Sequence, residues 1–312
     1  MISIVIPTFN RRDCLAKLLD DLLLQEDVER EIIVVDDNSR DGTDGMMRER
    51  YPQVIYLRNE VNRGPTISRN RAIRQASGEI ILGLDSDVTL PDRQLLARTE
   101  KLFAELPRMT ALAPRVLEPD GLTDDAPRWW HPLPIQPYAS RRFETDYFSG
   151  TAWAFRREEL VRIGSFSESI FQYYEEVELA YRFIDAGGVI LHEPQLAVLH
   201  HPGTRATGWS DHRMFHHPRS LVLFALGSFP VLRGTFFLIP RLGNAFLKAV
   251  LTRRLFTFFR AMGSAAEAVP AQLRERKPLQ RATWRRIAAL RHAGRPELFE
   301  HPRVSSPEVR AA

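Results

Sequence analysis

Residues 80–88, with the sequence IILGLDSDV, decide how the rest of the chain is interpreted. Apolar or small residues run directly into two acids, Asp85 and Asp87, a pattern typical of a strand that is buried on both faces. Open parallel α/β sheets bind ligands at the carboxyl ends of their strands. Two carboxylates repel each other there, and a divalent cation with oxygen ligands would relieve the repulsion. A solvated turn after the strand is the alternative.

The composition describes a large folded chain whose charge is unevenly distributed. Its 312 residues are 44% hydrophobic, which is enough for an extensive core and excludes a disordered chain. The single Cys14 excludes an internal disulfide and a cysteine metal cluster. From Arg219 onward there are 17 Lys and Arg against 5 Asp and Glu, whereas the part before it is acidic. A basic C-terminal part favours an anionic partner: a membrane surface, a nucleic acid or a phosphorylated lipid.

Strands and helices alternate four times in the first third of the chain. Apolar runs at 3–10, 31–35, 54–57 and 80–88 predict strands, and helical spacing or turn chemistry predicts helices at 15–23, 43–51, 67–76 and 95–106. Right-handed crossovers in such βαβ units gather the carboxyl ends of the strands at one edge of a mainly parallel sheet. We therefore expect Pro7, Asp36, Asp37, Asp85 and Asp87 to lie close together.

The second half of the chain is less regular. Strands are predicted at 112–117, 149–155, 189–191 and 197–199, and a helix is predicted to open over 171–182 and to end at Gly187 and Gly188. Residues 118–147 lack periodicity, as long functional loops do. Their aromatic residues Trp129, Trp130 and Tyr138 either stack on a sugar or base or pack as a satellite core, and the sequence leaves both interpretations open.

Three further groups are candidates for chemistry. Glu175, Glu176 and Glu178 open a predicted helix, where one carboxylate can act as a general base while the others favour the helix dipole. His200 follows a strand, and it is either structural or a third metal ligand. Arg69 lies on a helix that starts near the same edge, and it either binds diphosphate oxygens or forms a surface salt bridge.

Together these motifs resemble the family-2 glycosyltransferases of GT-A fold, notably their bacterial rhamnosyltransferase-like members. The resemblance covers roughly residues 1–210. It is carried by the segments SIVIPTFNR (3–11), IIVVDDNSRDGT (32–43), NRG (62–64), SRN (68–70), GE (78–79), DSD (85–87), SGT (149–151), RR (156–157), GSF (164–166), YEEVEL (174–179) and VLH (198–200), with Glu168. Glu at 176 and 178 departs from the Asp that is common in the family.

The resemblance implies a hexosyltransferase that moves a sugar from a nucleotide-diphospho-sugar to a hydroxyl acceptor with inversion. Glu176 would be the catalytic base, with Glu175 as the alternative. Mg²⁺ or Mn²⁺ would be held by Asp87, Asp85 and His200. The donor would contact Pro7, Thr8, Phe9, Asn10, Asp36, Asp37, Asn62, Gly64, Arg69, Asp85, Ser86 and Gly150.

The expected organisation is a GT-A catalytic domain over residues 1–215, with a nucleotide-sugar-binding half (1–115) and an acceptor-binding half (116–215). Residues 216–312 are expected to form a basic, amphipathic helical extension. The acceptor we expect is a cell-envelope or exopolysaccharide glycan, with lipid-linked forms among the candidates. Within residues 219–262 cationic residues interrupt apolar ones, which favours contact with a membrane surface over a spanning helix. Packing on the catalytic domain or on a second subunit is the alternative.

Met1 leads directly into a predicted strand, so we expect no secretory signal and a cytoplasmic protein, peripheral to the inner face of the cytoplasmic membrane if residues 219–262 contact lipid. A dinucleotide oxidoreductase is disfavoured because the first strand is not followed by a Gly-x-Gly-x-x-Gly turn. The basic part has no recognisable motif for reading nucleic acid, so no nucleic acid is expected as partner. A non-catalytic sugar-nucleotide-binding protein on the same fold is the alternative function.

Overall fold

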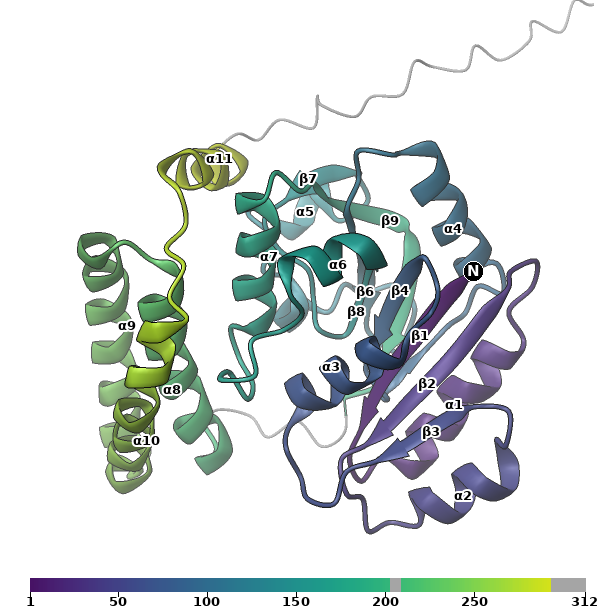
Figure 1. Cartoon of the computed structure of the whole chain (residues 1–312), viewed down its shortest axis with the longest axis horizontal. Helices are drawn as coiled ribbons and strands as arrows, with labels where there is room; N and C mark the ends of the chain where they lie inside the picture. The colour runs from purple at the N-terminus through teal and green to yellow at the C-terminus, as the bar shows by residue number, and fades with distance from the viewer. Residues whose placement is uncertain (203–208, 293–312) are drawn as a thin grey trace, which may run out of the picture.

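One continuous sheet forms the centre of the computed structural model, which describes residues 1–202 and 209–292 (Figure 1). The strands follow the order β3-β2-β1-β4-β8-β6-β9-β5, and β7 also pairs with β9. Their bounds are β1 Ile2–Thr8, β2 Arg30–Asp36, β3 Ile55–Arg58, β4 Ile80–Leu84, β5 Val88–Thr89, β6 Ala111–Leu117, β7 Phe143–Thr145, β8 Ala152–Arg156 and β9 Ile190–His200. The mixed, mainly parallel α/β sheet predicted from the sequence is confirmed.

The first four strands form the parallel part of the sheet. β1 lies between β2 and β4, and β3 extends the sheet beyond β2. The register pairs Ile4 of β1 with Ile32 on one side and Leu82 on the other, so apolar side chains of three strands point to the same face. Every residue of β4 is buried, as its unbroken apolar sequence predicts. Because these strands are parallel, their carboxyl ends meet at one edge.

The remaining strands bring a second set of residues to that edge. β8 runs antiparallel between β4 and β6. β9 is one continuous strand, whereas the sequence predicted two pieces at 189–191 and 197–199. Its register with β6 shifts, since Pro114 pairs with Glu193 but Arg115 pairs with Ala197, and this bulge absorbs the interruption. β9 therefore runs on to His200 without a break.

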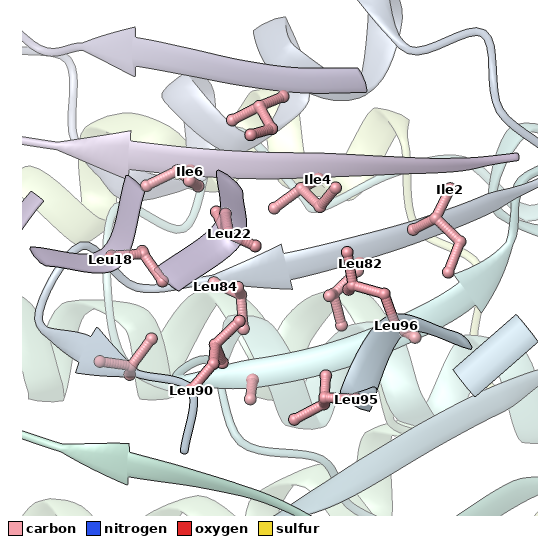
Figure 2. Packing of buried hydrophobic residues seen from close by; sticks show 14 of the residues in the cluster. Ile2, Ile4, Ile6, Leu18, Leu22, Leu82, Leu84, Leu90, Leu95 and Leu96 are labelled. Carbon is pink, nitrogen blue, oxygen red and sulfur yellow. The ribbon is translucent and has the colours of Figure 1, made fainter. Parts of the chain in front are cut away.

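Helices cover both faces of the sheet (Figure 1). One face carries α1 (Arg12–Leu23), α2 (Thr43–Arg50) and α4 (Leu95–Glu105), and the other carries α3 (Pro65–Gln75), α6 (Arg157–Ile163) and α7 (Glu175–Asp185). Figure 2 shows the first of the two resulting cores, in which Ile2, Ile4 and Ile6 of β1 meet Leu18 and Leu22 of α1. Alternation along the strand and helical spacing of the leucines put all five side chains in one layer.

The segment 118–147 contains a 3₁₀ turn η1 (Ala126–Arg128), a short helix α5 (Ile135–Tyr138) and β7. The ring of Trp129 packs against His131, Phe143 and His192, with centroids 4.6, 6.2 and 5.2 Å away. This tryptophan belongs to a satellite core. Trp130 is instead 48% exposed, and stacking of this ring on a sugar or base stays a prediction.

The C-terminal helices α8 (Asp211–Ser228), α9 (Val231–Leu251) and α10 (Leu255–Arg274) pack together beside α7 (Figure 1). The predicted boundary at 215/216 falls inside α8, which Ser210 caps by accepting the N–H of Arg213. The predicted division at 115/116 likewise falls inside β6. Neither position coincides with a change of element, because changes in charge and pattern do not mark where a helix or strand ends.

Helix α11 (Arg281–His292) returns from this group to the sheet. Arg286 pairs with Glu144 of β7 at 2.5 Å, and Arg291 pairs at 2.5 Å with Asp146, which is fully buried. A buried carboxylate is costly without a partner, so the Arg291 ion pair ties the end of the described chain to the sheet. Within the described ranges, none of the helices has both the length and the apolar character needed to cross a bilayer.

Candidate active site

Two connected cavities lie at the carboxyl edge of the parallel strands. The strand-edge cavity, of about 400 Å³, is lined by expected residues Pro7, Thr8, Phe9, Asp37, Asn62, Gly64, Asp85, Ser86 and Asp87. The α7 cavity, of about 370 Å³, is lined by expected residues Asp85, Gly150, Glu175 and Glu176. Asp85 and Gln172 line both cavities, so the two spaces adjoin there. Most of the predicted residues are thus gathered by the topology of the sheet.

Asp37 is held firmly in the strand-edge cavity. Its Oδ2 accepts the N–H of Gly64 at 2.7 Å, and its Oδ1 accepts the N–H of Arg63 at 2.9 Å and the side chain of Asn59 at 2.8 Å. The hydroxyl of Thr8, in the same cavity, is buried and has no hydrogen-bond partner among the residues described. Buried polar groups are normally paired, so this hydroxyl points to a polar ligand.

Asp36 and Asn10, which were expected to contact the donor, instead hold the turn after β2. Asp36 is fully buried and accepts the O–H of Tyr56 and the N–H of Ser39, each at 2.8 Å. The Asn10 side chain accepts the N–H of Arg40 at 2.8 Å. Neither residue lines the strand-edge or the α7 cavity, so nothing in these cavities supports the expected donor contact of Asp36 and Asn10. Their oxygens already have local donors.

The acids in the turn between β4 and β5 have separate cationic partners. Asp85 Oδ1 accepts a hydrogen bond of 2.8 Å from Nη2 of Arg69, and that nitrogen also donates to the carbonyl of Gly150 at 3.1 Å. Asp87 Oδ1 lies 3.7 Å from Nε2 of His200. Each carboxylate is therefore offset by a positive group, which relieves their mutual repulsion.

His200 connects this turn to a residue that the sequence did not identify. Its Nδ1 lies 2.6 Å from Oδ2 of Asp125. Burial lowers the pKa of His200, but the hydrogen bond with Asp125 and the nearby carboxylate of Asp87 outweigh burial and raise this pKa to about 9. Burial of Asp87 is likewise outweighed by His200, which holds the pKa of Asp87 below its ordinary value. Asp125 lies in the aperiodic segment 118–147, where no pattern singles it out.

The two glutamates at the start of α7 differ in access. Glu175 is 3% exposed and lies 3.6 Å from Nη1 of Arg69. Burial, and then the charge of Glu176, raise the pKa of Glu175 well above its ordinary value, while Arg69 opposes the rise. Glu176 is only partly buried and its Oε1 lies directly against the Cα of Gly150, where a Cβ would overlap it. Glu176 is therefore the carboxylate that a ligand in the α7 cavity reaches.

Several lining residues come from parts of the chain that no motif covered. The segment 118–147 contributes Arg128 and Trp130 to the α7 cavity, α8 contributes Arg213 and His217 to the same cavity, and α8 contributes His212 and His216 to the strand-edge cavity. The only sequence signal for the α8 residues is their i, i+4 spacing, which places each pair on one face of a helix.

The side chains at this edge fit a divalent cation whose coordination shell is completed by other ligands. Asp85 and Asp87 offer carboxylate oxygens and His200 offers an imidazole nitrogen, which are ligand types that Mg²⁺ and Mn²⁺ accept. In the part of the chain that the structure describes, however, no three acidic, histidine or cysteine side chains are grouped to hold an ion by themselves. The predicted three-ligand site is not preassembled, because Arg69 engages Asp85 and Asp125 engages His200.

Comparison with known sequences identifies the family. Residues 3–164, just over half of the chain, match the model of glycosyl transferase family 2. An N-acetylglucosaminyl-diphospho-decaprenol L-rhamnosyltransferase of Mycobacterium tuberculosis is 26% identical over 261 residues, which cover 72% of this chain and 84% of that protein. A poly(ribitol-phosphate) beta-glucosyltransferase of Bacillus spizizenii is 41% identical over 103 residues, which cover 30% of this chain and 16% of that protein.

Solved structures share the fold. A mannosyltransferase from Pyrobaculum calidifontis, determined with GDP-Man and Mn²⁺, aligns with a TM-score of 0.56 and 22% identity over 93% of this chain and 83% of its own. S. aureus TarS (residues 1–349), determined with UDP-GlcNAc, aligns with a TM-score of 0.59 and 20% identity over 87% of this chain and 82% of its own. The GT-A fold predicted from the sequence is confirmed. The family match extends from the first strand to the end of α6, and the chain is therefore a glycosyltransferase that belongs to glycosyl transferase family 2.

Proposed function

We propose that the protein is an inverting glycosyltransferase that moves a sugar from a nucleotide-diphospho-sugar to a hydroxyl acceptor. The observation that carries the proposal is the junction of the two cavities at Asp85. Asp37 and Asp87 line one cavity, and Glu176 lines the other. A donor in the strand-edge cavity and an acceptor in the α7 cavity meet at this junction, which brings the reacting groups together.

The strand-edge cavity is the proposed donor site. Structures of the same fold hold UDP-GlcNAc in S. aureus TarS and GDP-Man in the Pyrobaculum mannosyltransferase. In this chain Asp37 is fixed by hydrogen bonds and can accept from a nucleobase N–H or a ribose hydroxyl. Phe9 is 45% exposed and offers a ring face to the base, and the unpartnered hydroxyl of Thr8 lies beside it.

Glu176 is the proposed catalytic base. It accepts the proton of the acceptor hydroxyl while that oxygen bonds to the anomeric carbon and the bond from this carbon to the diphosphate oxygen breaks. Attack from the face opposite the leaving group inverts the configuration. General-base assistance typically contributes about 10²–10⁴-fold to a rate. Glu175, buried behind Glu176, lies next to Arg69 and helps to position that guanidinium against Asp85.

Mg²⁺ or Mn²⁺ is the proposed cofactor, held by Asp87 with Asp85 and His200. When bound, the cation offsets the negative charge that develops on the departing nucleoside diphosphate. The Pyrobaculum mannosyltransferase was determined with Mn²⁺. In this chain Asp125 orients the imidazole of His200 through Nδ1, so that Nε2 faces Asp87.

The proposed acceptor is a cell-envelope or exopolysaccharide glycan, in free or lipid-linked form. The names of the Mycobacterium and Bacillus relatives give a diphospho-decaprenol-linked sugar and a poly(ribitol-phosphate) as their acceptors. We place the protein in the cytoplasm, at the inner face of the cytoplasmic membrane. The support for membrane contact through residues 219–262 is the exposed apolar surface of α9 and α10.

A transfer assay with a panel of sugar nucleotides, Mn²⁺ and hydroxyl acceptors tests the proposal. We expect Glu176→Gln to lower transfer by about 10²–10⁴-fold and to keep the thermal stabilisation by donor. Asp87→Asn should lose the Mn²⁺-dependent part of that stabilisation. Glu158→Gln, an equivalent change at an exposed position, should match the parent protein.

Two results would contradict these assignments. If Glu176→Gln transfers sugar at the parental rate, then the base is another group. If the parent protein is stabilised by a donor but neither transfers nor hydrolyses it with any acceptor offered, then the cavities bind a sugar nucleotide without acting on it.

A further inference from the structure

We propose that the α7 cavity contains an anion subsite, formed by Arg128 and Arg213, for a phosphate or diphosphate group on the acceptor. The inference rests on the proposed function and adds the chemical class of the acceptor to it. Both arginines line the cavity that holds Glu176, and neither lines the strand-edge cavity. Arg128 comes from η1 and Arg213 comes from the first turn of α8, so two separate segments of the chain supply the positive charges.

Neither guanidinium group has a carboxylate partner among the residues described, although that of Arg213 lies over the ring of Trp209 at 5.1 Å. The Nε atom of each is buried without a hydrogen-bond partner, and neither side chain forms an ion pair within the described ranges. By contrast, Arg69 forms an ion pair with Asp85 at 2.8 Å, although its Nη1 is also buried without a hydrogen bond, and Arg182 outside the cavity pairs with Glu178 at 2.7 Å. A buried charged donor without an acceptor is unfavourable, and an anionic ligand in the cavity would remove that penalty.

Both positive charges reach Tyr173 in the α7 cavity, and the charge of Arg128 also reaches Asp87 and His200. Burial raises the pKa of Tyr173, and the charges of Arg213 and Arg128 both oppose that rise. The charge of Arg128 also opposes the rise in the pKa of Tyr147, and that of Arg213 opposes the rise in the pKa of Tyr174, so both arginines act on tyrosines that line the α7 cavity. Two planar guanidinium groups suit the oxygens of a phosphate or diphosphate better than a single cation does.

The aromatic side chains that line the α7 cavity fit a sugar next to the proposed phosphate or diphosphate. Trp130 is 48% exposed, and its ring is stacked with that of Tyr147 at 6.3 Å and meets the ring of Tyr174 edge-on at 6.3 Å. An exposed aromatic ring offers an apolar face to a sugar ring. A sugar against Trp130 would direct a hydroxyl to Glu176 and its phosphate to the arginines. The acceptor class is thus a sugar carried on a phosphate or diphosphate.

Calorimetric titration of the full chain tests the subsite, with a saturating nucleoside diphosphate filling the strand-edge cavity. The probes are geranyl diphosphate, inorganic pyrophosphate and glucose 1-phosphate, with geraniol and glucose as neutral counterparts. We expect the anionic probes to bind and the neutral ones not to bind. Arg128→Gln and Arg213→Gln should each weaken binding of the anionic probes by about tenfold or more. Arg285→Gln, the same change at an exposed position of α11, should leave it unchanged.

The outcomes distinguish a lipid-linked diphosphate from a sugar phosphate, and they distinguish an acceptor subsite from a donor site. Tighter binding of geranyl diphosphate than of pyrophosphate assigns the subsite to a lipid-linked diphosphate, and tightest binding of glucose 1-phosphate assigns it to a sugar phosphate. The subsite is refuted if the doubly substituted protein binds all three anions as the Arg285→Gln protein does. It is also refuted if the arginine variants lose affinity for the nucleoside diphosphate by the same factor, since the arginines would then hold the donor. Loss of transfer with intact anion binding would refute the proposed function alone.

Discussion

Gly150 allows the carboxylate of Glu176 and the guanidinium of Arg69 to lie close to the backbone between them. Its carbonyl accepts from Arg69 at 3.1 Å, and a Cβ at this position would overlap Oε1 of Glu176 and lie 3.0 Å from Nη2 of Arg69. The atoms that would be displaced are the far ends of flexible side chains rather than backbone. A side chain at position 150 therefore moves the carboxylate and the guanidinium more than it strains the fold.

We predict that Gly150→Ala folds normally and transfers sugar at least about tenfold more slowly, because a displacement of Glu176 by an ångström is enough to misalign a base. Steady-state transfer kinetics and thermal unfolding would measure the two effects. Gly45→Ala is the control, since no atom lies within 4 Å of a Cβ there. That variant should keep full activity and gain up to about 1 kcal/mol from its helical position. Equal activity of the two variants would show that Gly150 does not position Glu176.

His200 makes the metal-free protein sensitive to alkaline pH. The hydrogen bond with Asp125 and the nearby carboxylate of Asp87 outweigh burial and raise the pKa of His200 from 6.5 to about 9. Because the folded state binds this proton more tightly than the unfolded chain does, the resulting stability is fully present below about pH 6.5. It is lost as the pH rises through about 9.

We expect the parent protein in EDTA to exceed His200→Gln in free energy of unfolding at pH 6, and the difference to shrink by up to about 3 kcal/mol at pH 9.5. Urea unfolding of both proteins at the two pH values measures this change. Comparison of the two proteins at each pH cancels the titration of groups that do not interact with His200. A difference that is constant with pH would mean that the proton on His200 is not held by its two carboxylates.

At the scale of elements, β4 depends on the absence of a side chain in its middle. Gly83 pairs with Trp153 of β8, and a Cβ on Gly83 would fall within the indole ring. Trp153 is fully buried, and its ring packs against Phe148, Phe155 and Phe166. The ring therefore has no free space into which it could move. A glycine in a strand is intrinsically unfavourable, and here the packing of tryptophan requires it.

Gly83→Ala is accordingly predicted to destabilise the protein by about 1–3 kcal/mol or more through overpacking. Thermal or urea unfolding gives the value. Gly263→Ala in α10 is the matched change, because no atom lies within 4 Å of its Cβ, and it should be neutral or stabilising. Equal stabilities would indicate that the core around Trp153 adapts freely.

At the scale of the whole molecule, α9 and α10 present an apolar and basic surface. Large exposed side chains recur along them at helical spacing: Leu232, Phe236, Ile239, Phe246, Leu247, Val250, Phe256 and Phe259. Residues 231–262 contain six Lys and Arg and no Asp or Glu. Apolar surface with cationic neighbours is the composition of helices that lie in the headgroup region of an anionic membrane.

We predict that the protein floats with vesicles that contain phosphatidylglycerol, binds neutral phosphatidylcholine vesicles more weakly, and is released from the anionic vesicles by high salt. Phe256→Ser, at a side chain that is 76% exposed, should reduce flotation. Leu122→Ser changes an equally exposed apolar residue in segment 118–147 and should not. No flotation, together with a dimer in sedimentation, would assign this surface to a second subunit.

The fold and the donor side of the candidate site follow closely from the sequence. The apolar run of β4, the spacing of the βαβ units and the acids at strand ends are local patterns, and the handedness of the crossovers turns them into a shared edge. Asp37, Asp85 and Asp87 therefore reach the strand-edge cavity as predicted. The helices of the first third also lie within a few residues of their predicted bounds.

Tertiary structure alone decided which neighbouring side chains face the cavity. Asp36 and Asp37 are adjacent, but Asp36 is the last residue of β2, where Tyr56 and Ser39 hold its carboxylate, whereas Asp37 follows the strand and lines the cavity. Burial likewise separates Glu175 from Glu176, which the sequence could not distinguish.

Asp125, Arg128 and Arg213 come from segments without periodicity or from a helix beyond the family motifs, and only long-range packing brings them to the site. Local sequence patterns specify which residues end a strand, because that choice depends on near neighbours. Which side chains face the strand ends from the other wall of the cavity depends on contacts between residues distant in the chain. Local patterns do not encode those contacts.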